Sequence, residues 1–371
     1  MRVSFNRSAL AEALGLVASV VPSRTPKPVL RCLRITASGK EVVVSATDLE
    51  VGLNYSISQV EVEREGELVV EADHLLAIVR ESVDDVLVLE AKETTCEVRG
   101  ADSRFTMYGH DPKQFPPVRS LEAGEADLLV TLDQLQSGIQ QSLFATARES
   151  SRYAINGVLW EVKGKKLTLV ATDGRRLARR RVELEKAAGK ELAERKTIVP
   201  SKTMGLLEKL GAREKESVAV KLVDNQVLIR YANVVVSSNL VEGNFPRYED
   251  IIPTDYDKKL ALRTQAFLSA VRRAALLTSE ESKGIKLAIG NDAVVFSGSS
   301  PETGAAEISM PIDYKGEPID IGFNPQFLAD ALRVVQTEQV ELELGQPDRP
   351  GVIKSGADFL YVLMPINLGR D

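Results

Sequence analysis

The sequence contains little of the chemistry that most catalytic and metal sites use. Its 371 residues include two cysteines, two histidines and one tryptophan. Cys32 and Cys96 lack the paired spacing of a zinc or redox motif, so we expect both to be buried, small apolar residues in a reducing compartment. His74 and His110 have no second ligand or catalytic partner at a useful spacing. We therefore expect no histidine-based metal site or catalytic triad, and no cofactor.

Long apolar runs and an excess of positive charge are also missing. The N-terminus lacks the apolar region of a secretory signal, and no segment reaches the length of a membrane-spanning helix. We therefore expect a cytoplasmic protein without a membrane partner. Lys and Arg number 47 against 53 Asp and Glu, for a net charge of −6. This balance argues against a uniformly basic surface but permits one positive face. No Walker or GxGxxG motif follows a predicted strand, so a nucleotide enzyme has no support.

The clearest positive feature is a short sequence motif that occurs twice. The segment from Leu167 predicts a strand, a two-residue Asp173-Gly174 turn of type I′ and a second strand. The same Ala-Thr-Asp sequence ends at Asp48, about a third of the chain earlier. A Phe-Pro pair also occurs twice, at Phe115 and Phe245. Echoes at this distance indicate tandem copies of one domain.

Helices and strands repeat in the same way. Apolar residues at helical spacing predict six helices, of which five follow a polar residue that can cap them. These cap residues are Asn6, Asp73, Ser201, Thr264 and Asn324. β-branched and alternating apolar segments predict strands between the helices. They span 29–36, 41–47, 51–58, 67–71, three strands within 86–108, 157–162, 167–172, 175–182, 197–200, three within 218–240, 285–289, 293–298, 305–311, 318–322, 339–344, 351–355 and 360–365.

This order predicts an α+β fold of three copies, each with a helix and antiparallel strands occurring twice. The predicted domains are 1–122, 123–253 and 254–371. Each helix must bury its apolar stripe against a sheet. Copies joined head to tail have unlike ends, so the array either extends as a filament or closes into a ring. Closure with every helix on one surface would leave the sheets on the other.

These features resemble the bacterial sliding clamp family, the beta subunit of DNA polymerase III. The resemblance is carried by the paired Ala-Thr-Asp phrases, by the Phe245-Pro-Arg-Tyr-Glu-Asp-Ile-Ile-Pro253 junction and by the closing Tyr361-Val-Leu-Met-Pro-Ile366, and it covers the whole chain. It implies a head-to-tail homodimeric ring, with helices inside and sheets outside, that encircles double-stranded DNA without sequence specificity. The implied function is processivity in DNA replication, without catalysis. The implied partners are the polymerase alpha subunit, the clamp loader, and other polymerases and repair proteins that bind through short linear motifs.

The resemblance and the basic residues on or beside the predicted helices together predict a positive lining for DNA. The candidate DNA contacts are Arg24, Arg80, Arg148, Arg152, Tyr153, Lys202, Arg272 and Arg273. The dense basic run from Arg179 to Arg181 is instead interpreted as the solvated face of a strand. At the dimer interface, the resemblance places Leu276 and Leu277 against residues near Arg104 and Phe105.

The resemblance also implies an apolar pocket for partner peptides between the second and third copies. Its wall consists of Ile155, Thr172, Gly174, Arg175, Arg176, Leu177, Pro246, Ile251, Val362, Met364, Pro365 and Ile366. Gly174 lets a peptide backbone approach, and Arg176 can hold a peptide carboxylate or carbonyl. Two features depart from the family. Asp250 stands where a basic residue is common, and the chain continues through Asn367 to Asp371, with Asn367 in place of a common arginine.

Two other functions fit parts of the pattern. Asp48 and Asp173 could form the acid/base pair of an enzyme, but such a pair must share one cleft, and these residues fall in separate, equivalent copies. Each is better explained as a turn residue. A repeat-built scaffold that binds proteins without encircling DNA stays open, and salt-dependent association with closed circular DNA separates it from a clamp.

Overall fold

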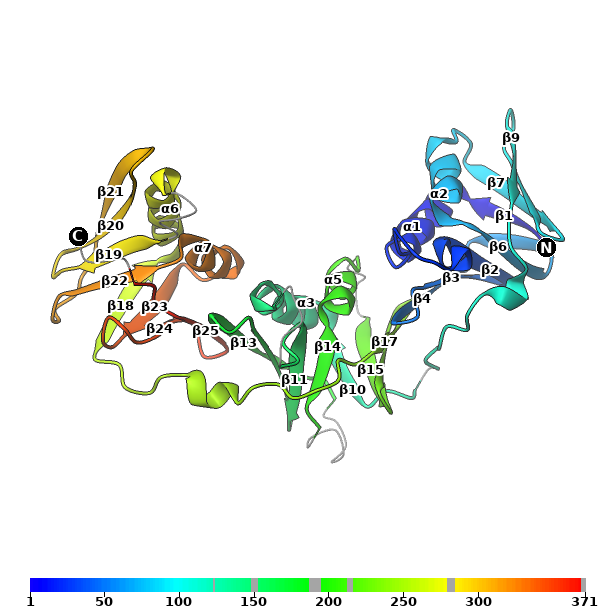
Figure 1. Ribbon diagram of the computed structural model, residues 1–371. Helices are drawn as coiled ribbons and strands as arrows, with labels where there is room; N and C mark the ends of the chain where they lie inside the picture. Colours follow the sequence, from blue (N-terminus) through cyan, green and yellow to red (C-terminus); the bar gives the residue numbers. More distant parts are fainter. Residues whose placement is uncertain (123, 148–152, 187–194, 212–215, 279–283, 368–371) are drawn as a thin grey trace. The chain divides into compact units, whose positions relative to one another are not determined.

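The described residues form two compact bodies (Figure 1). The computed structural model describes residues 1–122, 124–147, 153–186, 195–211, 216–278 and 284–367. The first body comprises the described residues of Met1–Leu132, Leu184–Gly189 and Lys209–Leu240, and the second those of Asp133–Glu183, Lys190–Glu208 and Val241–Asp371. Each body contains one eight-stranded sheet and one smaller sheet, and all the strand pairings given below are antiparallel.

The first body has sheets of eight and five strands. The larger sheet has the order β10 (Leu128–Thr131), β15 (Ser217–Val223), β16 (Gln226–Tyr231), β17 (Val234–Asn239), β4 (Val51–Ile57), β3 (Glu41–Thr47), β2 (Cys32–Ser38) and β6 (Gly66–Glu71). The smaller has the order β5 (Val60–Arg64), β1 (Arg2–Asn6), β7 (Val86–Lys92), β8 (Thr95–Arg99) and β9 (Arg104–Tyr108). Helices α1 (Arg7–Ala18) and α2 (Ala72–Glu81) pack against each other, and α1 contacts β3 and β4. The buried stripe of α1 is Leu10, Leu14 and Val17, as its spacing predicts.

The second body repeats this plan with a four-stranded smaller sheet. The larger sheet has the order β14 (Thr197–Pro200), β11 (Gly157–Lys163), β12 (Lys166–Thr172), β13 (Arg176–Glu183), β25 (Phe359–Leu363), β24 (Gly351–Ser355), β23 (Gln339–Leu344) and β18 (Lys258–Arg263). The smaller has the order β21 (Gly304–Pro311), β20 (Ala293–Ser300), β19 (Ile285–Ile289) and β22 (Ile319–Phe323). The helices assigned to this body are α3 (Leu132–Gln140), α5 (Ser201–Glu208), α6 (Thr264–Ala274) and α7 (Pro325–Val334), and α6 packs against α7.

The two large sheets show how consecutive copies of the repeat are joined. In the first, β17 of the second copy pairs with β4 of the first copy. In the second, β25 of the third copy pairs with β13 of the second copy. We call these pairings the first junction and the second junction. Read from β10 in one sheet and from β18 in the other, the two strand orders correspond position by position. The chain therefore contains three tandem α+β copies, and each large sheet is shared between two of them.

Two of the predicted helix caps are present. The side-chain oxygen of Asn6 accepts a hydrogen bond from the backbone N of Ala9 at 3.1 Å, at the start of α1. Asn324 likewise accepts from the backbone N of Gln326 at 2.9 Å, and Pro325 occupies the first helical position of α7. In both helices the cap is an Asn residue directly before the first helical residue. Its side chain turns back and reaches the first turn of the helix.

The other three predicted cap residues lie within helices. Asp73 is in the first turn of α2, which begins at Ala72 after Glu71, and Ser201 and Thr264 are the first residues of α5 and α6. In all three cases the helix begins at or before the predicted cap residue, directly after the preceding strand, so that residue falls inside the helix. The Thr264 hydroxyl donates a hydrogen bond to the backbone oxygen of Thr337 at 2.7 Å. This bond joins the start of α6 to the loop between α7 and β23.

The strand prediction is wrong at several boundaries and misses four strands. Residues 29–31 belong to a short 3-10 helix, η1 (Pro28–Arg31), because Pro28 fixes a helical φ in its first turn, and β2 begins only at Cys32. The strand predicted to end at Pro365 ends at Leu363. The missed strands are β1, β5, β10 and β18. Three of them, β1, β10 and β18, run directly into a helix.

The central hairpin is present, but its turn is not of type I′. A type I′ turn needs positive φ at both central residues. Only Gly174 adopts one here, at +87°. The loop between β12 and β13 has three residues and is held by side chains. The Asp173 carboxylate accepts from the backbone N of Arg175 and of Arg176, at 3.0 and 3.1 Å. The Thr172 hydroxyl accepts from the N of Gly174 and donates to the oxygen of Arg176.

The loop at Asp48 repeats this network bond by bond. The Thr47 hydroxyl accepts from the N of Leu49 at 3.0 Å and donates to the oxygen of Val51 at 2.9 Å. The Asp48 carboxylate accepts from the N of Glu50 and of Val51, at 2.9 and 2.7 Å. Leu49 takes the left-handed conformation, φ +79°, at the position that the second copy fills with glycine. The repeated Ala-Thr-Asp sequence thus forms the same loop structure in both copies, and both aspartates are turn residues.

Candidate functional site

The second junction brings the central hairpin beside the end of the chain. β13 pairs with β25 so that Leu177 lies opposite Val362. Beyond β25, the backbone N of Met364 donates to the oxygen of Arg175 at 2.9 Å, which places the C-terminal segment along the hairpin loop. The N of Ile366 donates to the oxygen of Gly322 at 2.9 Å, so the segment is fixed at both ends. Residues far apart in the sequence thus form one continuous surface.

A buried apolar cluster supports this surface from below. Leu177 and Val362 are both 1% exposed, and they share a cluster with Tyr248, Leu360 and other residues. Phe245 and Ile252, from the segment that joins the second and third copies, pack against the same cluster. Packing of this kind fixes the positions of the residues above it.

The upper side of the surface is apolar and open. Met364 is 41% exposed and Ile251 is 39% exposed. Gly174 and Arg175 are exposed at the tip of the hairpin, whereas Pro246, Pro365 and Ile366 are half-buried. Thr172 and Ile155 are buried. All twelve predicted pocket residues lie in the second body, and the large apolar side chains that they expose are Ile251 and Met364.

Arg176 is engaged within the protein. Its Nε donates to Asp173 at 2.9 Å, one Nη donates to Asp330 at 2.8 Å and the other donates to the backbone oxygen of Phe144 at 2.7 Å. The guanidinium also stacks over Phe327, 4.3 Å from the ring centroid. Burial opposes the charge, but the hydrogen bond to Asp330 and the field of Asp173 outweigh it, so the pKa of Arg176 lies above its ordinary value. Its direct role is to join the hairpin to helix α7.

Replacing Arg176 with methionine should destabilise the second body strongly. The change leaves Asp173 without its cation and leaves the largely buried Asp330 with Arg333 alone. Removing one partner of a buried ion pair costs about 3–5 kcal/mol. We expect the midpoint of thermal unfolding to fall by several degrees, whereas Arg175→Met, at an exposed neighbour, should leave it nearly unchanged. Equal midpoints for the two variants would show that the ion pairs of Arg176 do not stabilise the fold.

The partners of Arg176 escaped the sequence prediction. Asp330 and Phe327 lie on α7 and Phe144 lies in the 3-10 helix η3 (Leu143–Ala145), and nothing near them in sequence marks them as neighbours of the hairpin. A second unpredicted network holds Tyr248, whose hydroxyl donates to Glu161 at 2.5 Å. Burial and this hydrogen bond raise the pKa of Tyr248 well above its ordinary value. Both networks fix the segments that form the pocket wall.

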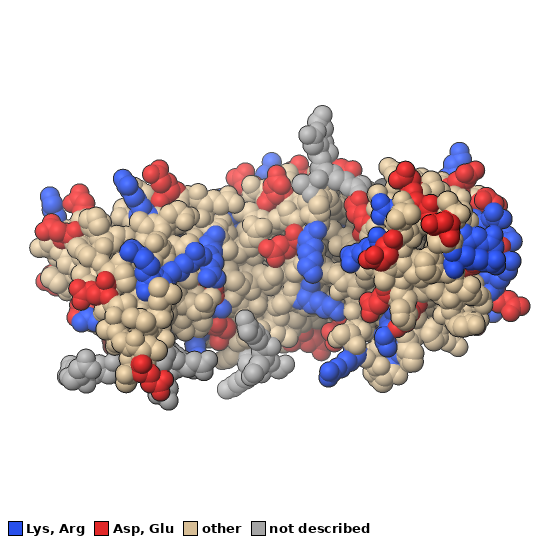
Figure 2. Space-filling view, turned by 90° about the horizontal axis from the view of Figure 1, so that it is seen from above, with Lys and Arg blue, Asp and Glu red and all other residues tan. Residues whose placement is uncertain are grey.

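The candidate DNA contacts that are described occupy exposed positions on or beside helices. Arg24 follows α1, Lys202 is on α5, and Arg272 and Arg273 are in the last turn of α6. Tyr153 is 48% exposed. Arg80, in the last turn of α2, lies close to Gly15 of α1. Arg148 and Arg152 lie outside the described residues. Seen from above, Lys and Arg side chains lie among Asp and Glu on this face of the molecule (Figure 2).

The predicted dimer residues expose apolar surface at the ends of the two smaller sheets. Phe105, on the edge strand β9, is 40% exposed, and its neighbour Arg104 pairs with Glu97. Leu276, in the 3-10 helix η5 (Ala275–Leu277), is 76% exposed. Leu277 is half-buried, and its backbone oxygen accepts from the Thr303 hydroxyl just before the edge strand β21.

Both cysteines are buried, as their isolated positions in the sequence predict. Cys32 and Cys96 are buried free thiols, and burial raises their pKa values to about 11 and about 12. Thiols with such values are poor nucleophiles near neutral pH. Among the described residues, no group of three or more His, Cys, Asp or Glu side chains is arranged to hold a metal ion. In the same part of the chain, no helix has both the length and the apolar character needed to cross a membrane.

Comparison with known proteins identifies the family. The N-terminal, central and C-terminal domains of the DNA polymerase III beta subunit match residues 1–119, 130–247 and 249–367. The chain belongs to the DNA polymerase III beta subunit family. The beta sliding clamp of Pseudomonas putida is 33% identical over 374 residues, covering 99% of this chain and 100% of that protein.

Solved structures of the family have the same fold. The sliding clamp of Pseudomonas aeruginosa bound to griselimycin has a TM-score of 0.92 at 31% identity, covering 99% of both chains. The DNA polymerase sliding clamp of Bacillus subtilis has a TM-score of 0.93 at 27% identity, again covering 99% of both chains. The beta-subunit resemblance inferred from the repeated phrases is thereby confirmed.

Proposed function

We propose that this protein is a DNA sliding clamp, a homodimeric ring that encircles duplex DNA and holds the replicative polymerase on it. Membership of the beta subunit family supports this function. Beta subunits act as processivity factors, so we propose no catalytic role. The proposed copies extend over 1–122, 123–253 and 254–371, and the proposed location is the cytoplasm, where the chromosome is replicated.

One structural observation carries the proposal of a closed dimer. At both junctions, the last strand of a copy pairs with the third strand after the first helix of the preceding copy. Two strands are left without this pairing, β9 at one edge of the five-stranded sheet and β21 at one edge of the four-stranded sheet. By the same rule β9 must pair with β21. Joining them gives β5-β1-β7-β8-β9-β21-β20-β19-β22, in which the eight strands from β1 to β22 follow the same order as the other two large sheets and β5 is an additional edge strand.

Within one chain this pairing would require the two ends of a three-copy array to meet. Two chains can instead form this pairing twice: β9 of each chain pairs with β21 of the other. The two contacts are heterologous and are related by a twofold axis. Unpaired edge strands also invite uncontrolled association, so a built-in partner removes that hazard. Exposed Phe105 and Leu276 lie on or next to these edges and would be covered by the pairing.

The basic residues on the helices are proposed to face the DNA. The described ones are Arg24, Arg80, Lys202, Arg272 and Arg273, with Tyr153 beside them. Arg148 and Arg152 complete the proposed set. Contacts of this kind reach phosphates and carry no sequence information. Affinity through them should be weak and salt-dependent, with a dissociation constant of roughly 10⁻⁴ to 10⁻⁶ M. Weak contacts allow the ring to slide, and its closure keeps it on the DNA.

The surface at the second junction is proposed to bind short linear motifs of the polymerase alpha subunit, the clamp loader, other polymerases and repair proteins. Its exposed Met364 and Ile251 offer apolar contact area, and Met side chains adapt to varied ligands. Because Arg176 is engaged within the protein, the exposed Arg175 is the better candidate to meet a peptide carboxylate or carbonyl. Asp250 and the residues from Asn367 onwards are proposed to tune client preference.

Deleting Met364 to Asp371 should abolish peptide binding. The deletion removes Met364, Pro365 and Ile366 from the proposed wall, while the edges β9 and β21 stay intact. A fluorescent peptide rich in Gln, Leu and Phe serves as the probe, and its anisotropy reports binding. Deleting only Asn367 to Asp371 is the matched control, which should retain binding because the three wall residues remain. The dimer mass should be unchanged in both. Equal peptide affinity for the shorter and longer deletions would place the docking site elsewhere.

A further inference from the structure

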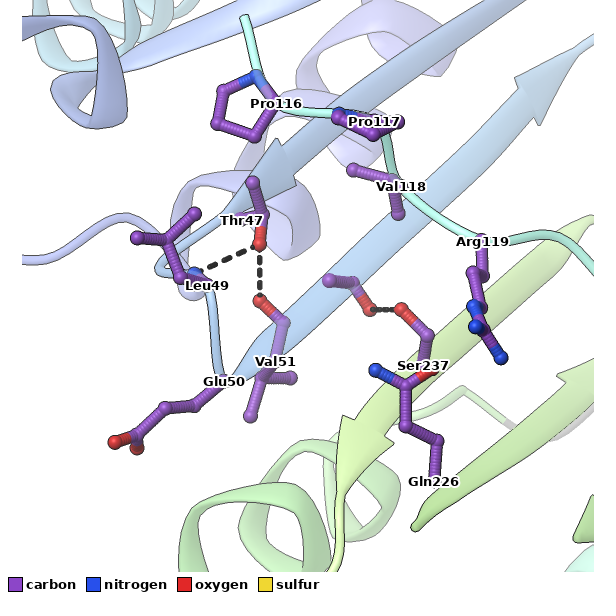
Figure 3. A pocket seen from close by; sticks show the side chains of 11 residues that line it. Thr47, Leu49, Glu50, Val51, Pro116, Pro117, Val118, Arg119, Gln226 and Ser237 are labelled. Atoms are coloured by element: carbon purple, nitrogen blue, oxygen red, sulfur yellow. Dashed lines mark hydrogen bonds between the residues drawn. The ribbon is translucent and has the colours of Figure 1, made fainter. Parts of the chain in front are cut away.

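A cavity lies at the first junction, at the position that corresponds to the proposed peptide pocket. It has a volume of about 310 Å³ and lies wholly within the first body. It is formed by the loop at Asp48, by the segment after Phe115 and by β17 (Figure 3). The corresponding elements at the second junction are the loop at Asp173, the segment after Phe245 and β25.

Three matching positions carry smaller residues at the first junction. Gly52 lies opposite Ser237, whereas Leu177 lies opposite Val362 at the second junction. Val118 follows Phe115 by three residues, as Tyr248 follows Phe245. At the second junction, the larger Leu177, Val362 and Tyr248 pack together in one buried cluster. At the first junction, Val118 and Ser237 pack closely over Gly52, and the three residues line one side of the open cavity.

The rim of the cavity carries an apolar group that the fold does not need. Leu49 is 49% exposed and has a φ of +79°, a conformation that strains a leucine and that the second copy gives to Gly174. A glycine would serve the turn equally well. Figure 3 shows Leu49 and Glu50 on one side of the cavity and Arg119 on the other, with Pro116 and Pro117 between them. Leu49 thus forms an apolar wall of this cavity, as Met364 does in the proposed pocket at the second junction.

The polar groups of the cavity indicate the charge of the occupant. Glu50 stands where Arg175 stands in the second copy, so the charge at this end is reversed. The exposed Glu50 carboxylate therefore calls for a cationic hydrogen-bond donor at this end of the cavity. Arg119, at the opposite end, is exposed and suited to a peptide carbonyl.

We propose that this first-junction pocket binds a short extended peptide from a partner protein, with an apolar side chain inserted beside Leu49 and a Lys or Arg side chain paired with Glu50. The comparison with the second junction rests on the proposed function. The chemistry of the pocket does not, because it follows from its own lining residues. The ring then has two kinds of docking sites, selective for peptides of opposite charge.

Photo-crosslinking with two matched peptides tests this proposal. The probes are Ac-Lys-Leu-Val-Leu-NH2 and Ac-Glu-Leu-Val-Leu-NH2, each with a photoreactive leucine at the first Leu. Both are applied to the full-length dimer and to the variant that lacks Met364 to Asp371, and mass spectrometry locates the labels. We expect the Lys probe to label the segments 47–52 and 116–119 about five- to tenfold more than the Glu probe, with or without the C-terminal residues.

Three variants separate docking from folding. Leu49→Gly should reduce labelling by the Lys probe about tenfold without lowering the midpoint of thermal unfolding, because glycine relieves the strained φ. Glu50→Arg should reverse the preference between the probes. Glu61→Arg, an equal charge change at an exposed residue of β5, should alter nothing. Absence of label at the first junction, or labelling that ignores Leu49→Gly and Glu50→Arg, would overturn the proposal. Failure of the second-junction pocket would appear separately, as peptide binding insensitive to the C-terminal deletion.

Discussion

Replacing Leu276 and Leu277 with aspartate is expected to convert the dimer into a monomer. Leu276 is 76% exposed in the isolated chain and lies beside the open edge β21. Burial of two leucines at the interface favours dimer formation by several kcal/mol of free energy. Burial of two unpaired carboxylates in their place disfavours it. Light scattering or sedimentation should therefore give half the native mass, with the fold of the chain retained, because neither side chain belongs to a core.

Leu49→Asp is the matched control. Leu49 is 49% exposed and lies in the loop between β3 and β4, in a sheet that contains neither β9 nor β21. Its replacement should leave the mass of the dimer unchanged. If the double aspartate variant keeps the native mass, the contact between chains does not involve η5, and the pairing of β9 with β21 is not the closing joint.

The protein should be retained on a nicked circular DNA and lost when that circle is cut once. A ring that encloses DNA leaves it only by opening or by sliding off an end, so retention depends on topology rather than affinity. Backbone contacts through helix-borne arginines and lysines are too weak and salt-sensitive to hold the protein at high salt by themselves. Gel filtration at high salt, before and after cleavage by a restriction enzyme, measures the difference.

Two comparisons make this experiment decisive. The Leu276→Asp, Leu277→Asp variant should not be retained on either form of DNA, because it cannot close. A circle incubated with the inactive restriction enzyme should keep the protein. Equal retention on circular and linear DNA would contradict encirclement. No retention on either form would favour the protein-interaction scaffold that does not encircle DNA.

Local sequence predicted those parts of the fold that local contacts decide. Strand β3 begins and ends where its alternating residues predict, and Asn6 caps its helix because its side chain can reach the first turn unaided. The Thr-Asp loops are visible in the sequence because the side chains that hold them lie within the loop itself. The turn type was wrong because those same side chains replace the two-residue turn that Asp-Gly alone would favour.

Contacts between distant segments could not be predicted in this way. Arg176 looked like a ligand for a peptide because its partner Asp330 lies on a helix of another copy. The sharing of each large sheet between two copies depends on which strand edges are left open after each copy folds. The first-junction pocket is lined by residues from three segments, Gly52, Val118 and Ser237, which meet at one place. Each residue alone is unremarkable in the sequence.

The shared sheets also bear on how such a chain can arise. The two junctions within the chain pair corresponding strands, β17 with β4 and β25 with β13. The proposed contact between chains repeats this pairing with no linker at all. The number of copies carried by one polypeptide is therefore independent of the architecture. Gene duplication and fusion could redistribute six copies among one, two, three or six chains while every joint stayed the same.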